Sequence, residues 1–205
     1  MTLEQTAIHE AGHAIVWLTE ESELGPLTLV TTLPGDGSLG RVLGTEKASR
    51  LTTPRQRRAL ARALAAGGIA ERLAGYPTAG PEACDAEKLA RVALLGENFS
   101  NTSPGARLVR TQRARRFIEA AEAGAELALR AQWGGVLRLR ETLLSLGILT
   151  PPHGIELVRL AFEERPLRPL APDLETLTRL LRAVERVPEI TEPFRRELRG
   201  IARAA

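Results

Sequence analysis

TAIHEAGHAIV, residues 6–16, places His9 and His13 four positions apart, with Glu10 directly after the first histidine. The stretch lies within an apolar-periodic segment from Leu3 to about Glu20, a pattern that predicts a buried helix. Residues four apart on a helix share one face about 6 Å apart, so both imidazoles can reach one Zn²⁺ at about 2.1 Å. The stretch therefore predicts a zinc site on the first helix.

Glu10 is the candidate catalytic residue of this motif. It is rotated about 100° from His9 around the helix, so it lies beside the histidine pair and reaches an attacking water rather than the ion. We expect it to act as a general base and then to protonate the leaving amine of a cleaved peptide. The alternative is that the histidines are ordinary residues of an amphipathic helix. The scarcity of histidine, three in 205 residues, and the apolar flanks favour zinc.

A third ligand must come from elsewhere, because catalytic zinc sites use three protein ligands and keep one position open. The chain has a single cysteine, and its remaining histidine, His153, is most simply a loop residue, so a carboxylate is expected. Asp85 in TAGPEACDAEKLARVA, residues 78–93, is best placed, and its rivals are Glu82, Cys84 and Glu87. Acidic residues in a first helical turn also complement the helix dipole without any metal. Spacing alone therefore leaves the third ligand open.

The segments after the first helix predict a small hairpin and a second helix. Two apolar stretches, Leu27–Leu33 and Leu39–Leu43, are typical of paired strands. Thr53 opens a helix to about Leu73 with a capping box, and this helix contains Gly67-Gly68. Each glycine costs about 1 kcal/mol relative to alanine, so we expect another backbone to approach closely there, with Gly12 as the candidate neighbour.

The rest of the chain reads as helical. We expect a helix over Pro81–Leu95, a long helical region over 104–146 with Gly124 and Gly134-Gly135 as candidate breaks, and helices near 152–164, 173–187 and 191–204. The sequence thus predicts a mainly α fold with a small β-hairpin beside the first helix. Residues 1–165 are expected to form one domain, and residues 166–205 a helical extension packed on it.

Composition excludes several classes of protein. No apolar run approaches the 18 residues that a membrane span needs, and the start of the sequence lacks signal-peptide features, so no membrane association and a cytoplasmic location are expected. A net charge of +3 over a mixed surface does not predict nucleic-acid binding. The densest basic run has one nearby aromatic residue and reads as a solvated helix face; it consists of Arg107, Arg110, Arg113, Arg115 and Arg116.

Four stretches together resemble a known family. TAIHEAGHAIV, LTLVTTLPGDGSLGRV, LAAGGIAERLAG and TAGPEACDAEKLARVA are similar, in order and spacing, to the peptidase domain of the FtsH family of ATP-dependent zinc proteases. The likeness covers about residues 3–95 and is weaker over 105–160, where a long helix and GILTPPHGIELVRL look like the closing helices of that domain. Residues 166–205 have no counterpart.

The resemblance implies a helical zinc-peptidase domain. Carried over position by position, it makes His9, His13 and Asp85 the zinc ligands and Glu10 the base. It also implies that the outer strand of the hairpin binds an extended substrate, through Leu39, Gly40, Arg41 and Val42. Cys84 stands where the family has asparagine.

The family's ATPase signature, GxxxxGK[ST], does not occur in this sequence. We therefore expect a zinc endopeptidase that cuts unfolded or flexible polypeptides without ATP, or after delivery by a separate unfoldase or adaptor. Two other functions stay open: a site-specific protease of one regulatory protein, and a non-catalytic module that binds a partner protein. The sequence does not indicate an oligomeric state.

Overall fold

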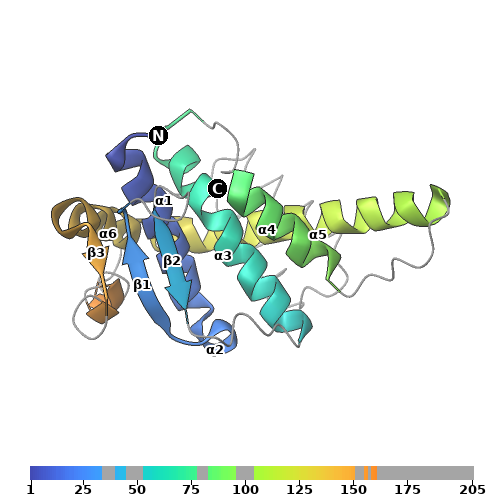
Figure 1. Cartoon of the computed structure of the whole chain (residues 1–205), viewed down its shortest axis with the longest axis horizontal. Helices are drawn as coiled ribbons and strands as arrows, with labels where there is room; N and C mark the ends of the chain where they lie inside the picture. The colour runs from blue at the N-terminus through green and yellow to red at the C-terminus, as the bar shows by residue number, and fades with distance from the viewer. Residues whose placement is uncertain are drawn as a thin grey trace, which may run out of the picture.

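The computed structural model describes residues 1–33, 40–44, 53–77, 83–95, 104–150, 155–156 and 158–160. Within these ranges the chain is mainly helical, with one small antiparallel sheet of three strands in the order β2-β1-β3 (Figure 1). The sheet lies beside the first helix, whose residues contact β1 and β2. The predicted mainly α fold with a small sheet is confirmed.

Helix α1, Leu3–Thr19, carries both histidines of the motif. The hydroxyl of Thr2 caps it by accepting a 3.2 Å hydrogen bond from the backbone N–H of Gln5. Every residue from Thr6 to Leu18 is buried, so the helix has no solvent face over that stretch. This extent matches the prediction to within one residue. The short helix α2, Glu21–Leu24, which follows it, was not predicted.

The sheet contains one strand more than the predicted hairpin. Strand β1, Leu27–Thr31, pairs with β2, Arg41–Gly44, and on its other side with β3, Ile148–Leu149. No helix or strand was predicted for residues 147–151, so strand β3 is an addition to the predicted fold. Gly147 has a φ of 73°, which ends the preceding helix, and its carbonyl accepts a 2.9 Å hydrogen bond from the N–H of Thr32. That pairing depends on a partner more than 100 residues away in sequence.

Helix α3, Pro54–Leu73, begins with the predicted capping box at Thr53 and packs along α1. The two backbones meet at Gly12. A Cβ atom on Gly12 would lie 2.5 Å from the Cβ of Ala70 and 2.9 Å from the carbonyl oxygen of Ala66. The predicted close approach with Gly12 as the neighbour is therefore what the structure shows, but Gly12 meets Ala66 and Ala70 rather than Gly67-Gly68.

The long helical region breaks just before Gly134-Gly135, one of its two predicted breaks. It consists of α5, Pro104–Ala131, and α6, Trp133–Leu146, which meet at Gln132. Gly124, a predicted break, lies inside α5, where a Cβ would be 2.6 Å from the Cδ of Arg62. Its role is close packing against α3 rather than a bend, so the expected break at Gly124 was wrong.

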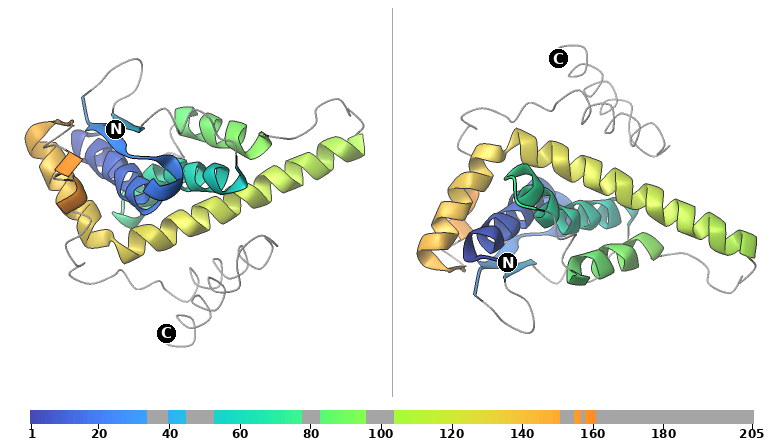
Figure 2. Two further views of the ribbon diagram at one scale, coloured as in Figure 1. Left: turned by 90° about the horizontal axis from the view of Figure 1, so that it is seen from below. Right: turned by 90° about the horizontal axis from the view of Figure 1, so that it is seen from above.

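The helices pack in two apolar clusters. The larger joins α1, α3, α5 and α6 to the sheet, and α6 turns across the end of the α1–α3 pair while α5 runs along its side (Figure 2). The smaller cluster attaches helix α4, Ala83–Leu94, to α3 and α5 through Ala61, Leu89, Val92 and Ala121. Within the described ranges, no helix combines the length and the apolar character needed to cross a membrane.

Some predictions concern residues beyond the described ranges. Residues 155–156 and 158–160 are helical, within the helix expected over 152–164. The helices expected over 173–187 and 191–204 lie outside the described residues, and so does the whole extension over 166–205. The predicted domain division at residue 165 stays a prediction.

Candidate metal centre

The two histidines of α1 lie against one another in the interior. The exposed fraction is 1% for His9 and 8% for His13. Their Nε2 atoms are 2.9 Å apart, and the rings meet edge to face with centroids 4.6 Å apart. The four-residue spacing puts both rings on the same face of the helix, as expected.

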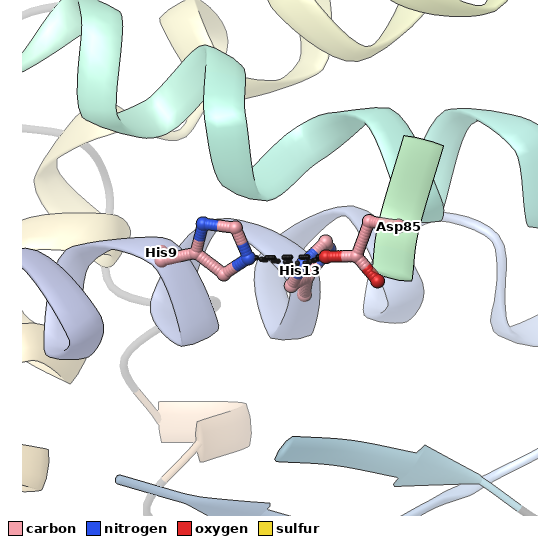
Figure 3. A group of neighbouring side chains, drawn as sticks. All are labelled: His9, His13 and Asp85. Atoms are coloured by element: carbon pink, nitrogen blue, oxygen red, sulfur yellow. Dashed lines mark hydrogen bonds and ion pairs between the residues drawn. The ribbon is translucent and has the colours of Figure 1, made fainter. Parts of the chain in front are cut away.

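Asp85 reaches this pair from the first turn of α4. Its Oδ2 atom is 3.1 Å from the Nε2 of His9 and 3.1 Å from the Nε2 of His13, and its side chain is 13% exposed. Figure 3 shows the three side chains converging from α1 and α4. We call these three atoms, His9 Nε2, His13 Nε2 and Asp85 Oδ2, the acceptor cluster. The structure thus brings together the three residues predicted as ligands.

In each imidazole, the hydrogen bond made by Nδ1 determines whether Nε2 has a lone pair available. Nδ1 of His13 is 2.6 Å from the carbonyl oxygen of Ala63, and Nδ1 of His9 is bonded to the carboxylate of Glu71. Because both oxygens only accept hydrogen bonds, each Nδ1 carries a hydrogen and donates it. In the neutral rings, both Nε2 atoms then present lone pairs toward the same point. Buried histidine ligands of metals are held in this way.

The acceptor cluster has the dimensions of a tetrahedral metal site. Two donors that each lie about 2.1 Å from a tetrahedral zinc are about 3.4 Å apart. The observed separations of 2.9, 3.1 and 3.1 Å come close to that value. Three lone pairs that face one another are mutually repulsive unless a cation or a proton lies among them. The cluster therefore fits a small divalent metal.

Gly67 of α3 provides the room for this arrangement. A Cβ atom at this position would lie 2.5 Å from the Nε2 of His9 and 2.5 Å from the Nε2 of His13. Any other residue would place a carbon atom against the Nε2 atoms of both histidines. The glycine pair was predicted to lie near the helix that carries the histidines. At Gly67 there is a steric reason for glycine, because a side chain would collide with the two imidazoles.

The charges around His9 change its pKa strongly. Burial lowers the pKa of His9, but the hydrogen bonds to Asp85 and Glu71 have the larger combined effect. In the metal-free protein the pKa of His9 is therefore raised to about 10. Burial in turn raises the pKa of Asp85, and the bonds to His13 and His9 outweigh that and hold this pKa far below its usual range. A proton on His9 therefore balances the carboxylates when no metal is bound, and a metal must displace it.

Glu10 lies beside this cluster, against the start of strand β2. It is 4% exposed, and its negative charge is one of the causes that raise the pKa of His9. A Cβ atom on Gly40 would lie 2.6 Å from the Oε1 of Glu10. Arg41 and Val42 continue from Gly40 into β2, an outer strand of the three described, while Leu39 lies outside the described residues. The predicted base and most of the predicted substrate strand are thus neighbours.

The rival third ligands do not join the cluster among the described residues. The side chain of Glu87 is 64% exposed and is 2.5 Å from Arg91 on its own helix. Glu82 lies outside the described residues, as does His153, and the side chain of Cys84 is not described.

Sequence reasoning missed Glu71, whose bond to His9 is buried. Gln5 holds the second carboxylate oxygen of Glu71 with a 2.6 Å hydrogen bond. A signal existed, because Glu71 is four residues after Gly67 and so shares its helix face toward α1.

The basic run at the start of α5 is exposed at Arg113, Arg115 and Arg116, and Arg115 bonds Glu119 at 3.0 Å.

No protein family model matches this chain, and no curated protein matches its sequence.

Proposed function

We propose that this chain is a zinc-dependent endopeptidase with the helical peptidase fold of the FtsH family. The observation that carries the proposal is the acceptor cluster with the buried Glu10 beside it. Two imidazole nitrogens and one carboxylate oxygen, with a fourth position open, form the kind of donor set that catalytic zinc sites use. Imidazole ligands favour zinc over magnesium and calcium, which prefer oxygen.

Each residue of the site has a defined role in this proposal. His9, His13 and Asp85 hold the ion, while Glu71 and the carbonyl of Ala63 orient the two rings. When bound, zinc supplies a Lewis acid that makes water acidic near neutral pH and stabilises negative charge on a peptide carbonyl. Glu10 takes the proton from the attacking water and returns it to the leaving amine.

The proposed substrates are unfolded or flexible polypeptide segments. Strand β2 lies at the side of the described sheet, where the backbone of Arg41 and Val42 can pair with an extended chain next to Glu10. A folded protein cannot offer such a strand without local unfolding. Because the sequence has no GxxxxGK[ST] motif, a separate unfoldase or adaptor would have to deliver folded substrates.

The proposal is tested by replacing Glu10 with glutamine in zinc-loaded protein. Glu10→Gln keeps the size of the side chain but cannot accept the proton, so cleavage of an unfolded fluorescent test protein should fall by about 10²–10⁴-fold. Zinc content should stay at one ion per chain. Glu87→Gln, on the exposed side of α4, is the matched control and should cleave normally.

The same preparations test the metal ligands and the alternatives. His13→Ala and Asp85→Ala should lose zinc, and full occupancy in Asp85→Ala would show that the third ligand is wrong. If wild-type protein cleaves no member of a peptide library faster than Glu10→Gln does, the proposal fails in favour of a non-catalytic binding module. Cleavage confined to one sequence in the library would identify a site-specific protease.

A further inference from the structure

The two oxygens of Asp85 have different partners. Oδ2 belongs to the acceptor cluster, 3.1 Å from both Nε2 atoms. Oδ1 faces the ammonium group of Lys88, with 3.4 Å between Oδ1 and Nζ. Lys88 is three residues after Asp85 on α4, so the two side chains lie on the same face of the helix. The carboxylate is thus held between the cluster and a cation from its own helix.

This arrangement matters because a carboxylate can bind a metal through one oxygen or through both. Free rotation about the Cβ–Cγ bond would let Oδ1 approach the ion beside Oδ2. An ammonium group bonded to Oδ1 opposes that rotation and stabilises negative charge on the oxygen that faces away. Groups that hydrogen-bond to metal ligands commonly orient them and tune the metal in this way.

The contact is too exposed to act mainly through stability. The side chain of Lys88 is 55% exposed, and ion pairs with such exposure contribute little to folding. Asp85, in contrast, is 13% exposed and has one oxygen already committed to the cluster. The consequence of the contact is therefore expected in the geometry of the metal site.

We propose that Lys88 is a positioning residue that keeps Asp85 a one-oxygen ligand, and so keeps the fourth position of the metal open. The inference rests on the proposed metal centre, though not on protease activity. It concerns a residue that touches neither metal nor substrate. Its signature is the coordination number of the bound ion.

Cobalt replaces zinc in such sites and reports coordination number through its visible absorption. We would load the full chain with Co²⁺ and compare wild type with Lys88→Met, which keeps an unbranched stem and removes the charge. Lys88→Arg, which restores a cation, is the rescue variant. Arg91→Met is the matched control, since Arg91 forms an ion pair with Glu87 on the same helix and its side chain is 77% exposed.

Wild type, Lys88→Arg and Arg91→Met should share the strong visible bands of four-coordinate Co²⁺. In Lys88→Met the band intensity should fall by roughly half or more, because Oδ1 joins the ion and raises its coordination number. An unchanged spectrum in Lys88→Met would overturn the inference, as would an equal change in Arg91→Met.

The failure of this inference is distinguishable from that of the proposed function. If wild type binds one Co²⁺ per chain but its zinc form cleaves no peptide, the spectra still decide the role of Lys88. If wild type binds no Co²⁺, the metal centre and the role of Lys88 fail together.

Discussion

The side chains of His9, His13 and Asp85 converge on one point, but different kinds of contact hold the histidines and the aspartate in place. The rings of His9 and His13 are buried, and each is held from behind by α3, through Glu71 and the carbonyl of Ala63. Asp85 is held through its outer oxygen by Lys88, an exposed neighbour on its own helix. The positions of His9 and His13, the imidazole half of the site, are thus determined by the packing of two buried helices. The position of Asp85, the carboxylate half, is determined by a local contact.

This difference indicates which half of the site is adjustable. Helix α1 is buried from Thr6 to Leu18 against α3 and α6, so its histidines cannot shift without disrupting the larger apolar cluster. Helix α4 attaches through the smaller cluster. Changes in the imidazole half should therefore weaken metal binding most, while changes around Asp85 should alter the geometry of the bound metal.

The largest expected effect comes from filling the space over the imidazoles. In Gly67→Ala the new Cβ would press on both Nε2 atoms, so zinc affinity should fall by more than the roughly 10–100-fold that is typical of changes in groups behind the ligands. Zinc affinity is measured by competition with a chromophoric chelator.

Gly12→Ala is the control for Gly67→Ala, because its Cβ meets Ala70 and the carbonyl of Ala66 at the same helix interface. It should lower the free energy of unfolding by about 1–3 kcal/mol through overpacking. Its folded fraction should still bind zinc normally. Wild-type zinc affinity in Gly67→Ala would contradict the idea that this glycine makes room for the site.

A smaller effect is expected from removing the charge behind His9. Glu71→Gln keeps the size of the side chain and an acceptor oxygen for Nδ1, but the neutral amide makes His9 a weaker donor to the metal. Zinc affinity should fall by about 10–100-fold. Glu119→Gln, which loses a partner of Arg115 on α5, should bind zinc as wild type does. Equal affinities in all three proteins would mean that Glu71 serves packing alone.

The smallest effect, about tenfold in zinc affinity per pH unit, follows from the two opposite pKa shifts. The pKa of His9 is raised from 6.5 to about 10, so the stability it contributes to the metal-free protein is complete below pH 6.5 and lost as the pH rises toward 10. The pKa of Asp85 is lowered from 3.8, so its contribution is present above that pH and lost as the pH falls.

Between pH 7 and 9 the response to pH should therefore come from His9 and not from Asp85. Metal-free protein should become easier to unfold in urea as the pH rises through this range, and zinc affinity should increase because the proton on His9 competes less strongly with the metal. A metal-free stability that rises with pH over the same range would contradict the assigned shift of His9.

Local signals explain which parts of the fold were predictable. The cap at Thr53 and the apolar period of residues 3–20 are properties of neighbouring residues, and α1 and α3 begin where these signals place them. Strand β3 depends on a distant partner and was not predicted, whereas the break at Gln132 lies close to the predicted break at Gly134-Gly135. The break expected at Gly124 was wrong because a glycine inside a helix can allow close packing as well as bending.

The candidate site divides in the same way. Helical spacing was sufficient to put His9 and His13 together. Spacing left Asp85 among several carboxylates, and only the resemblance to a family favoured it before the structure placed it beside the imidazoles. Glu71 contacts His9 across two helices, and its spacing from Gly67 was the one signal for it in the sequence. Lys88 stands three residues after Asp85, a spacing that gained meaning only when Asp85 was placed beside the histidines. Zinc and peptide cleavage stay predictions.

The burial of α1 from Thr6 to Leu18 also bears on how the chain acquires its structure. A helix without a solvent face gains little stability until the surfaces that cover it exist, and here α3, α5 and α6 all follow it in the sequence. During synthesis the segment that carries the histidines is therefore made before the helices that cover it, and it reaches its final packing only after they have formed. Premature capture of metal by an unfinished chain is thereby disfavoured, since Asp85 and the α3 supports have still to arrive.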